Sequence, residues 1–286
     1  MNSNIDSFTS PFLTFNNGNK YPQLGFGTYY IDDQKAFESA YNIGYRLFDT
    51  APMYGNESDL GNFFSKLNPK PKREDFYITT KIGPDMQGKD KAYKSCEESL
   101  KNLKVDYIDL VVIHWPGIYG KGKAKEIRAG TWEGLEKLYF EGKIKNIGVS
   151  NYYTNHLKDL LSRCKIKPVL NQIEIHPLLV PLDTINYCKE NNIVVQAYCS
   201  MAQQDSKLVN NKIILKMAKK YKKSVSQICL KWALQHGIAI LPRSKNKDRI
   251  KENCQLFDFE IESNDMEEIN SLNCNYHVDW DPTNIE

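Results

Sequence analysis

The sequence predicts an α/β fold, a single (β/α)8 barrel formed by residues 1–286. Two observations favour this fold class. Apolar stretches of strand length alternate with amphipathic stretches along the whole chain, and there are eight of the former. In addition, no linker rich in Pro, Gly and Ser divides the 286 residues into two domains. A doubly wound sheet is the structural alternative, but Gly25-Phe26-Gly27 lacks the third glycine of the usual GxGxxG turn.

The N-terminal elements of this barrel are short. Residues 1–11 are polar, and we expect them to be flexible. Residues 12–22 enclose the turn sequence Asn16-Asn17-Gly18-Asn19, which is typical of a hairpin, and in a barrel this hairpin would plug the bottom. Residues 23–27 then form the expected first strand, and residues 32–43 the first helix.

The motif at residues 44–61 is the centre of the predicted fold. A short apolar strand at residues 45–48 ends in Asp49, and Pro52 then breaks the backbone. Tyr54 follows in a loop that contains Gly55. From about Asn56 onward apolar residues recur at helical spacing, so a helix starts there. A carboxylate at a strand end and a phenol on the following loop would lie at the rim where barrel enzymes have their active sites.

The alternation continues to the end of the chain. The remaining strands are expected at residues 76–80, 108–113, 144–149, 169–173, 193–197 and 238–241. The remaining helices are expected at residues 90–103, 131–141, 154–164, 182–191, 210–221, 224–236, 246–252 and 263–272, the last two being additional C-terminal helices. The helix at 131–141 stops at Gly142, and the tail at 273–286 has no regular pattern.

Composition excludes several classes of function. The 38 Lys and Arg nearly balance the 35 Asp and Glu, so charge gives no reason to expect a nucleic acid or a membrane as partner. The basic run at residues 121–125 is interpreted as a solvated loop. No signal peptide and no stretch of ~18 to 20 apolar residues is found. Seven cysteines at wide spacing favour neither a zinc site nor a disulfide framework, and we expect a cytosolic monomer.

Polar residues collect where the predicted strands end. Every strand after the first has one or two of them near its carboxyl end: Asp49, Lys81, His114, Ser150, Asn151, Gln172, Tyr198 and Arg243. Each alone is explained by an ion pair, a core histidine or a buried amide. In a barrel, however, all these strand ends meet on the face where catalysis is found.

The residue types at these strand ends suit the protonation of an oxygen. An ammonium such as Lys81 beside Tyr54 is expected to lower the pKa of the phenol, and Asp49 would keep the Lys81 charge oriented. His114 would supply a second hydrogen-bond donor to a carbonyl oxygen. No Ser or Cys has an obvious base and no metal cluster is recognised, so a cofactor that donates a hydride fits best.

The segment from Leu241 to Arg249 would hold such a cofactor. It has four cations around the junction between the last strand and the next helix, namely Arg243, Lys245, Lys247 and Arg249. The loop after strand eight is a common phosphate site in barrels. A solvated basic helix is the simpler interpretation of this run alone. Tyr198 is interpreted either as a core aromatic residue or as a platform for a nicotinamide ring.

Four motifs resemble those of the aldo-keto reductases over nearly the whole chain. They are Gly-Tyr-Arg-Leu-Phe-Asp-Thr-Ala-x5-Glu-x2-Leu-Gly (44–61), Ile-Asp-Leu-Val-Val-Ile-His-Trp-Pro (108–116), Gly-Lys-Ile-Lys-Asn-Ile-Gly-Val-Ser-Asn (142–151) and Pro-Arg-Ser-x4-Arg-Ile-x-Glu-Asn (242–253). The Gly25-Phe26-Gly27-Thr28 turn and the short tail with Trp280-Asp281-Pro282 also resemble this family, in particular its microbial and protozoan members.

The resemblance implies a reductase that transfers a hydride from NADPH to an aldehyde or ketone. It implies Asp49, Tyr54, Lys81 and His114 as catalytic residues, with Tyr54 as the proton donor. It implies that the cofactor is bound by Gly27, Thr28, Ser150, Asn151, Gln172, Tyr198, Met201, Arg243, Ser244, Arg249, Glu252 and Asn253. Within this set, Ser150, Asn151 and Gln172 would hold the carboxamide, Arg249 the 2′-phosphate, and Glu252 and Asn253 the adenine. No metal is implied.

The substrate side is less well defined. Tyr29 and Trp115 are expected as apolar walls, with His114 beside the carbonyl. Arg243 stands where the family usually has Lys, and Cys199-Ser200-Met201-Ala202 where it usually has Ser-Pro-Leu-Gly. Two other hypotheses were weighed, a cofactor-binding regulatory protein with weak or no catalysis and a Schiff-base aldolase using Lys81. An ion pair with Asp49 would make Lys81 a poor amine nucleophile.

Overall fold

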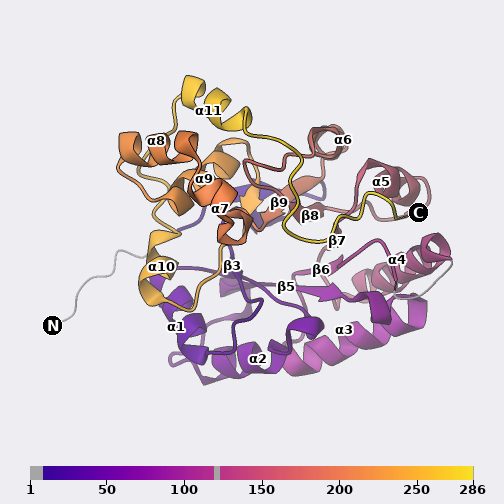
Figure 1. Ribbon diagram of the computed structural model, residues 1–286. Coiled ribbons are helices and arrows are strands. Elements are labelled where there is room, and N and C mark those ends of the chain that lie inside the picture. Colours follow the sequence, from indigo (N-terminus) through magenta and orange to yellow (C-terminus); the bar gives the residue numbers. More distant parts are fainter. Residues whose placement is uncertain (1–8, 119–122, 286) are drawn as a thin grey trace.

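A computed structural model describes residues 9–118 and 123–285, and it has a barrel of parallel strands surrounded by helices (Figure 1). Eight strands form one sheet in the order β10-β9-β8-β7-β6-β5-β4-β3. The barrel closes between its first and last strands, because Leu24 forms a parallel bridge with Ile240 and the Gly25 N–H donates to the Ile240 carbonyl at 3.0 Å. The predicted (β/α)8 fold is confirmed.

The strands are β1 (Phe12–Thr14), β2 (Lys20–Pro22), β3 (Phe26–Gly27), β4 (Leu47–Asp49), β5 (Tyr77–Ile82), β6 (Leu110–Ile113), β7 (Ile147–Ser150), β8 (Leu170–Glu174), β9 (Val194–Tyr198) and β10 (Ala239–Ile240). The helices are α1 (Gln34–Ile43), α2 (Glu57–Lys66), α3 (Lys89–Leu103), α4 (Ala124–Phe140), α5 (Thr154–Leu161), α6 (Leu182–Glu190), α7 (Ser206–Val209), α8 (Lys212–Tyr221), α9 (Val225–Gln235), α10 (Lys247–Glu252) and α11 (Ser263–Asn270).

The hairpin formed by β1 and β2 covers the N-terminal end of the barrel, as expected. Its Phe15 and Tyr21 are buried in one cluster with interior residues of the barrel strands, among them Leu110 and Leu170. The side-chain amides of Asn17 and Asn19 fix the turn by donating to Asn146, each at 2.9 Å. Alternate strand residues face outward and pack against the helices, so the barrel has an inner and an outer core.

The structure differs from the expected organisation most clearly in three places, while the other boundaries differ by up to three residues. Helix α4 begins at Ala124, seven residues before the expected start at Thr131. Lys123 and Lys125 of the basic run therefore lie at the start of this helix, and residues 121–122 lie outside the described part. The short helix α7 was not expected. Residues 10 and 11, which were expected to be flexible, are held by hydrogen bonds: Ser10 Oγ accepts one from the Leu24 N–H, and the Pro11 carbonyl accepts one from the Gln23 N–H. Residues 1–8 lie outside the described part.

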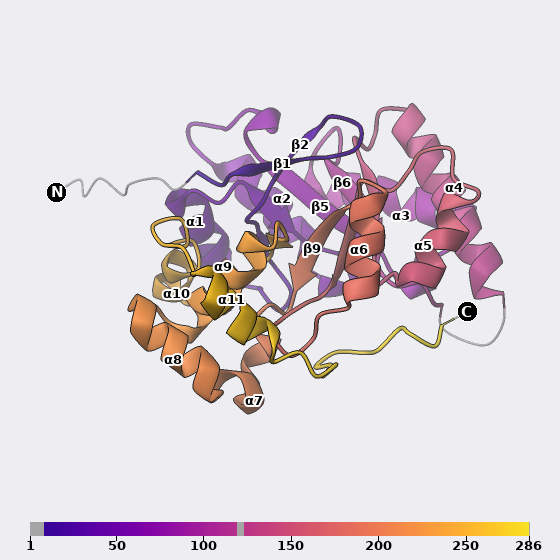
Figure 2. The same cartoon turned by 90° about the horizontal axis from the view of Figure 1, so that it is seen from above.

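The C-terminal tail crosses the opposite end of the barrel. Figure 2 shows the hairpin β1–β2 on one side of the barrel strands and the tail after α11 on the other. The carbonyl of Leu178 accepts from the N–H groups of Cys274 and Tyr276, which ties the start of the tail to the loop after β8. Among the described helices, none has both the length and the apolar character to cross a bilayer.

Candidate active site

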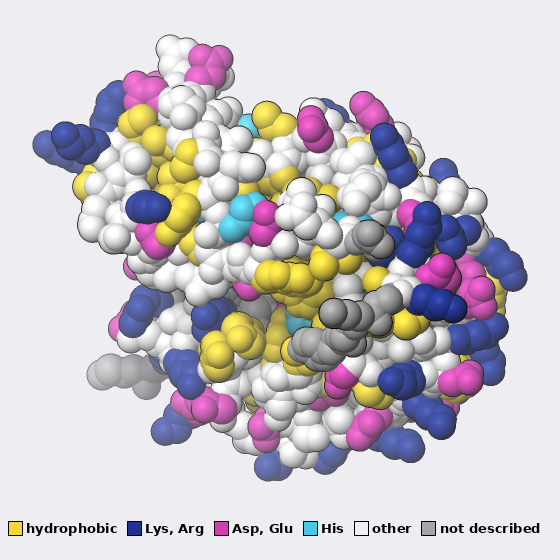
Figure 3. Space-filling view, turned by 45° about the vertical axis from the view of Figure 1, so that its right-hand side comes forward, with side chains coloured by type: hydrophobic (Ala, Val, Ile, Leu, Met, Phe, Trp, Pro, Cys, Tyr) yellow, Lys and Arg dark blue, Asp and Glu magenta, His cyan; other side chains and the backbone are white. Residues whose placement is uncertain are grey.

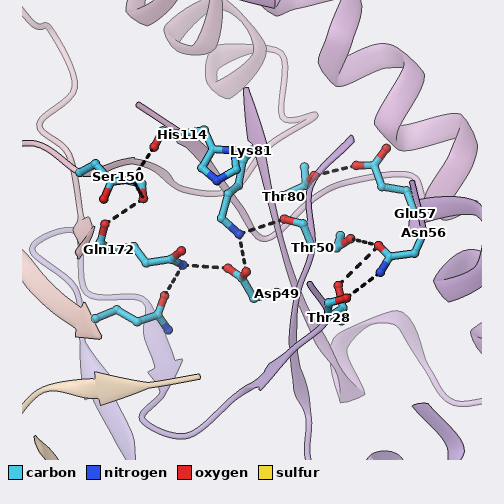
Figure 4. Close-up of polar contacts among 12 residues, drawn as sticks. Thr28, Asp49, Thr50, Asn56, Glu57, Thr80, Lys81, His114, Ser150 and Gln172 are labelled. Atoms are coloured by element: carbon cyan, nitrogen blue, oxygen red, sulfur yellow. Dashed lines mark hydrogen bonds and ion pairs between the residues drawn. The ribbon is translucent and has the colours of Figure 1, made fainter. Parts of the chain in front are cut away.

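A buried ion pair lies at the carboxyl ends of β4 and β5. Asp49 is the last residue of β4, and one of its carboxylate oxygens accepts a hydrogen bond from Lys81 Nζ (Figure 4). Lys81 has no exposed surface, and its ammonium also donates to the Thr50 carbonyl at 3.1 Å. Burial lowers the pKa of Lys81, although the Asp49 charge opposes this shift. Both side chains of the pair are almost fully shielded from solvent.

Tyr54 stands above this pair on a short turn. Residues 52–54 form a single 3-10 turn, and Gly55 ends it with a φ of +70°, a conformation that glycine adopts without strain. The Lys81 ammonium lies 5.0 Å from the centre of the Tyr54 ring. The pattern "strand, Pro, Tyr, Gly" thus places a phenol over the strand end that carries the ion pair.

The predicted effect of Lys81 on Tyr54 differs from what the structure gives. Burial, followed by the Asp49 carboxylate, raises the pKa of the Tyr54 phenol well above its usual value, where a lowered pKa was expected. The main reason is burial of the phenol, and the Asp49 charge next to the ammonium adds to the rise. In this geometry Tyr54 keeps its proton through the neutral range and has one to donate.

His114 follows β6 and faces Tyr54. The centres of the two rings are 5.9 Å apart and their planes are nearly perpendicular, at 77°. Burial, and then the Lys81 charge, lower the pKa of the imidazole to about 3, so His114 is neutral at physiological pH. Its Nδ1 has no hydrogen-bond partner within the described residues. A neutral imidazole here can offer one N–H to an oxygen held between the two rings.

A line of amides runs from the hairpin to Asp49 through the barrel interior. Gln172 Nε2 donates to the second carboxylate oxygen of Asp49 and to Gln196 Oε1, each at 2.8 Å. Gln196 Nε2 in turn donates to the Tyr21 hydroxyl at 2.7 Å. Both hydrogens of the Gln172 amide are therefore used inside the protein, and its oxygen is left as an acceptor for a ligand.

Residues from β7 and β9 form a second polar group beside Gln172. Ser150 Oγ donates to the Gln172 carbonyl at 2.8 Å, and Asn151 Nδ2 donates to the His114 carbonyl at 2.9 Å. Asn151 adopts a φ of +62°, and its side-chain oxygen accepts from the Tyr198 hydroxyl at 2.7 Å. This bond holds the Tyr198 ring in place as one wall of the cavity.

A buried asparagine that was not predicted fixes the loops around Tyr54. Asn56 Nδ2 donates to the carbonyls of Thr28 and Ile31, each at 2.8 Å, and its oxygen accepts from Thr50 Oγ1 at 2.7 Å (Figure 4). The loop after β3 is thereby fastened to the loop after β4. Each loop contributes a tyrosine to the cavity, Tyr29 and Tyr54, whose ring centres are 4.9 Å apart.

These side chains line a cavity of about 870 Å³ at the carboxyl ends of the strands. Most of the predicted site residues lie on its wall: Gly27, Thr28, Tyr29, Asp49, Tyr54, His114, Trp115, Ser150, Asn151, Gln172, Tyr198, Met201, Arg243, Ser244 and Arg249. Three do not. Lys81 is covered by its partner Asp49, and Glu252 and Asn253 lie at the end of α10, where Glu252 accepts from the Ser224 hydroxyl.

One end of the cavity is rich in cations, as the sequence predicted. Arg243, Lys245 and Arg249 line it, and Arg249 is exposed on α10. Arg243 Nη1 donates to the Tyr29 carbonyl at 3.2 Å, whereas Lys245 is paired with Asp32 at 2.6 Å. Gly27 is required at this end, because a Cβ there would come within 3.0 Å of the Leu241 carbonyl oxygen.

The opposite wall comes partly from the tail. The ring centres of Trp280 and Trp115 are 4.7 Å apart, and Asp279 lines the cavity next to them. Glu174, at the end of β8, accepts from the N–H groups of Val278 at 2.8 Å and Asp279 at 3.3 Å. Figure 3 shows hydrophobic side chains gathered in the middle of one face, with Lys and Arg side chains along the rim.

Sequence reasoning missed several residues of the cavity. Met53, Gln203, Gln204 and Asp279 line it but were not predicted. Met53 is the neighbour of the predicted Tyr54, and Gln203 and Gln204 follow the predicted Met201, so position in the chain was the available signal. Asp279 adjoins the tail motif Trp280-Asp281-Pro282, which the sequence singled out.

Comparison with known proteins gives one consistent result. The model of the aldo/keto reductase family matches residues 23–274. The glyoxal reductase of Bacillus subtilis is 38% identical over 277 residues, which cover 96% of each chain. An aldo-keto reductase from a Medee basin deep-sea metagenome library has 37% identity and a TM-score of 0.90 over 96% of this chain and 100% of its own.

A Bombyx mori aldo-keto reductase solved in complex with NADP is 31% identical, with a TM-score of 0.87 over 95% of each chain. The family match covers most of the chain, and both relatives and solved structures align over nearly the full length. The TM-scores show that the solved structures share the fold of this chain. The chain therefore belongs to the aldo/keto reductase family.

Proposed function

We propose that this protein reduces aldehydes and ketones to alcohols with NADPH, and that Tyr54 is the proton donor. The observation that carries the proposal is the arrangement of Tyr54 and His114 over the buried Asp49–Lys81 pair, at the floor of the cavity. The match to the aldo/keto reductase family and the NADP complex of the Bombyx mori enzyme support it.

The cavity wall fits NADPH in three respects. The side-chain amides of Gln172 and Asn151 offer polar contacts for the carboxamide of the nicotinamide. The Tyr198 ring offers a flat surface on which the nicotinamide ring can stack. Ser200, on the same wall, has a buried hydroxyl with no hydrogen-bond partner among the described residues, so this hydroxyl can donate a hydrogen bond to a phosphate oxygen. Arg243 and Arg249 then supply positive charge for phosphates farther along the cavity.

The catalytic roles follow from the protonation states. Bound NADPH supplies the hydride for the carbonyl carbon. Tyr54, with its raised pKa, holds a proton and donates it to the carbonyl oxygen as negative charge develops there. Neutral His114 orients that oxygen by donating a hydrogen bond from its imidazole N–H. Such a hydrogen bond is stronger in a site from which water is excluded. Asp49 and Lys81 hold the floor rigid beneath both donors.

The aldolase hypothesis receives no support from the cavity. Lys81 does not line it, and its Nζ is used by Asp49 and the Thr50 carbonyl. An amine that forms a Schiff base has to reach the substrate carbon and lose its proton. We also propose that the protein acts as a cytosolic monomer, which requires a mass in light scattering equal to that of one chain.

The proposed reaction is tested by a panel of aldehydes, ketones, sugars and quinones with NADPH and, separately, NADH. We expect NADPH consumption that matches alcohol formation for at least one aldehyde. NADPH that binds but is not consumed with any reactive aldehyde would favour the regulatory protein instead.

Replacing Arg249 by Ala is expected to weaken NADPH binding by roughly 10- to 150-fold, since hydrogen bonds with charged groups contribute about 1.5 to 3 kcal/mol. NADH, which lacks the 2′-phosphate, should bind nearly as before. Equilibrium titration of both cofactors measures this effect. Lys247→Ala is the matched control, because Lys247 is exposed on the same helix but does not line the cavity.

The same titrations test the role of Arg249 further, with a double variant and with changes in salt concentration. The Arg243/Arg249 double variant should lose more than the single one, because both arginines line the cavity and supply positive charge to it. The NADPH affinity of the single variant should also depend less on salt. An equal loss for NADPH and NADH would mean that Arg249 supports α10 and does not contact the phosphate.

Removing the tail after Cys274 is expected to raise the KM for carbonyl substrates more than the Kd for NADPH. The truncation deletes Asp279 from the cavity wall, and with it Trp280, which packs against the wall residue Trp115; Arg243 and Arg249 stay in place. Steady-state kinetics and cofactor titration, with circular dichroism to confirm the fold, measure it. Identical substrate profiles before and after truncation would contradict this role of the tail.

A further inference from the structure

Five charged side chains line the cavity, and they differ in what they are paired with. They are Asp49, Arg243, Lys245, Arg249 and Asp279. Asp49 is neutralised by Lys81, and Lys245 by Asp32. Arg243 and Arg249 belong to the cationic end that the proposed function assigns to the cofactor. Asp279 is thus the acidic group on the described wall that has no cation beside it.

The backbone around Asp279 is held from both sides. Glu174 accepts from the Val278 and Asp279 N–H groups, and Asp279 Oδ1 itself accepts from the Trp280 N–H at 2.8 Å. Trp280 then packs against Trp115. An irregular tail would normally leave an aspartate free to turn toward water, but these contacts fix the position of this carboxylate on the cavity wall.

The charge of Asp279 acts on the groups at the cavity floor. It is the largest cause after burial that raises the pKa of Tyr198, and a smaller cause, after burial, Asp49 and Tyr29, that raises the pKa of Tyr54. Asp279, Tyr54 and His114 line the same cavity, so a carbonyl compound held between Tyr54 and His114 shares that cavity with the Asp279 charge. Partial burial raises the pKa of Asp279, although the residue as a whole is exposed to solvent.

We propose that Asp279 determines which carbonyl compounds this pocket accepts, excluding those that carry a carboxylate and favouring cationic ones over neutral ones. The inference rests on the proposed function and adds its substrate class. The physical reason is charge repulsion or attraction at the cavity wall, where water screens less than in solution. Because Asp279 is partly exposed, we expect roughly a 5- to 30-fold effect on kcat/KM, less at high salt.

The test compares three matched aldehydes with NADPH: 4-carboxybenzaldehyde, its methyl ester and 4-(trimethylammonio)benzaldehyde. Asp279→Asn keeps the size of the side chain and the acceptor for the Trp280 N–H. We expect it to raise the kcat/KM of the acid relative to the ester by roughly 5- to 30-fold. It should lower the kcat/KM of the ammonium compound relative to the ester. Opposite changes of this kind do not arise from a merely loosened tail.

Asp281→Asn is the matched control, since Asp281 lies two residues farther along the tail and does not line the cavity. It should leave both ratios unchanged at every salt concentration. Equal ratios in the wild type and Asp279→Asn, or the same shift in Asp281→Asn, would overturn the role of Asp279. A wild type that reduces the ester while the ratios do not change in Asp279→Asn contradicts the inference alone. A wild type that reduces none of these aldehydes and no compound of the carbonyl panel contradicts the proposed function itself, so the two failures are distinguishable.

Discussion

Replacing Tyr54 by Phe is expected to lower the kcat of carbonyl reduction by about 10² to 10⁴-fold, the usual range for loss of a general acid. Only the hydroxyl is removed, and the ring that contacts Tyr29 remains. The Kd for NADPH should therefore change little. Single-turnover kinetics and cofactor titration on the same preparation separate the two effects.

The control for Tyr54 is Tyr30→Phe, because Tyr30 is 66% exposed and does not line the cavity. That variant should reduce aldehydes like the wild type. In the wild type, the raised pKa of Tyr54 means that the phenol stays protonated as pH rises through the neutral range, so reduction should show no loss from its ionisation below about pH 10. Tyr54→Phe with more than half of wild-type activity would remove Tyr54 from the mechanism.

Replacing Lys81 by Met is expected to lower the free energy of unfolding by about 3 to 5 kcal/mol, the usual cost of removing one partner of a buried ion pair. Asp49 would stay buried, with Gln172 as a hydrogen-bond donor but no cation. Its uncompensated charge would raise the pKa of Tyr54 further and slow proton donation. Urea unfolding measures the first effect, and the rate of aldehyde reduction the second.

Lys89→Met makes the same substitution at an exposed pair, in which Lys89 and Glu133 are 58% and 59% exposed. It should change stability little, because water already screens such a pair. If Lys81→Met unfolds at the same urea concentration as Lys89→Met, the Asp49–Lys81 pair does not support the cavity floor. If its reduction rate and pH profile also equal those of the wild type, Lys81 has no effect on Tyr54.

The polar residues at the strand ends were predictable, because the change from an apolar stretch to a polar residue marks the end of a strand in the sequence. An apolar stretch such as Leu110–Ile113 has to end where a polar residue follows, and parallel strands bring these ends together. Asp49, His114 and Ser150 could therefore be placed on one face without coordinates. The hairpin was predictable for a similar reason, since its Asn-Gly turn has few other conformations.

The remaining parts of the site depend on contacts between distant segments. Asn56 follows a predicted loop, but its bonds to Thr28 and Ile31 arise only when two loops meet. Gln196 is one polar residue inside an apolar strand. It donates a hydrogen bond to Tyr21 and accepts one from Gln172, and both partners come from other segments of the chain. Asp279 belongs to a tail without periodicity, and its place depends on the bond to Glu174 and on the packing of Trp280 against Trp115. Residue types alone do not specify such pairings.

The pKa of Tyr54 shows how a correct set of residues can still give a wrong electrostatic prediction. The types Tyr, Lys and Asp suggested a phenol beside an ammonium. The outcome depends on burial and on how closely Asp49 neutralises Lys81, and neither quantity can be obtained from the sequence.

The central claim, hydride transfer to a carbonyl carbon with a proton from Tyr54, is tested most directly with NADPH that carries deuterium at the transferred position of C4. The enzyme, this cofactor and benzaldehyde are incubated in ordinary water, and the alcohol is analysed by mass spectrometry. The account predicts one deuterium on the carbinol carbon for each NADPH oxidised. Oxidation of NADPH without deuterium in the alcohol, or binding of NADPH with no alcohol formed, would contradict it.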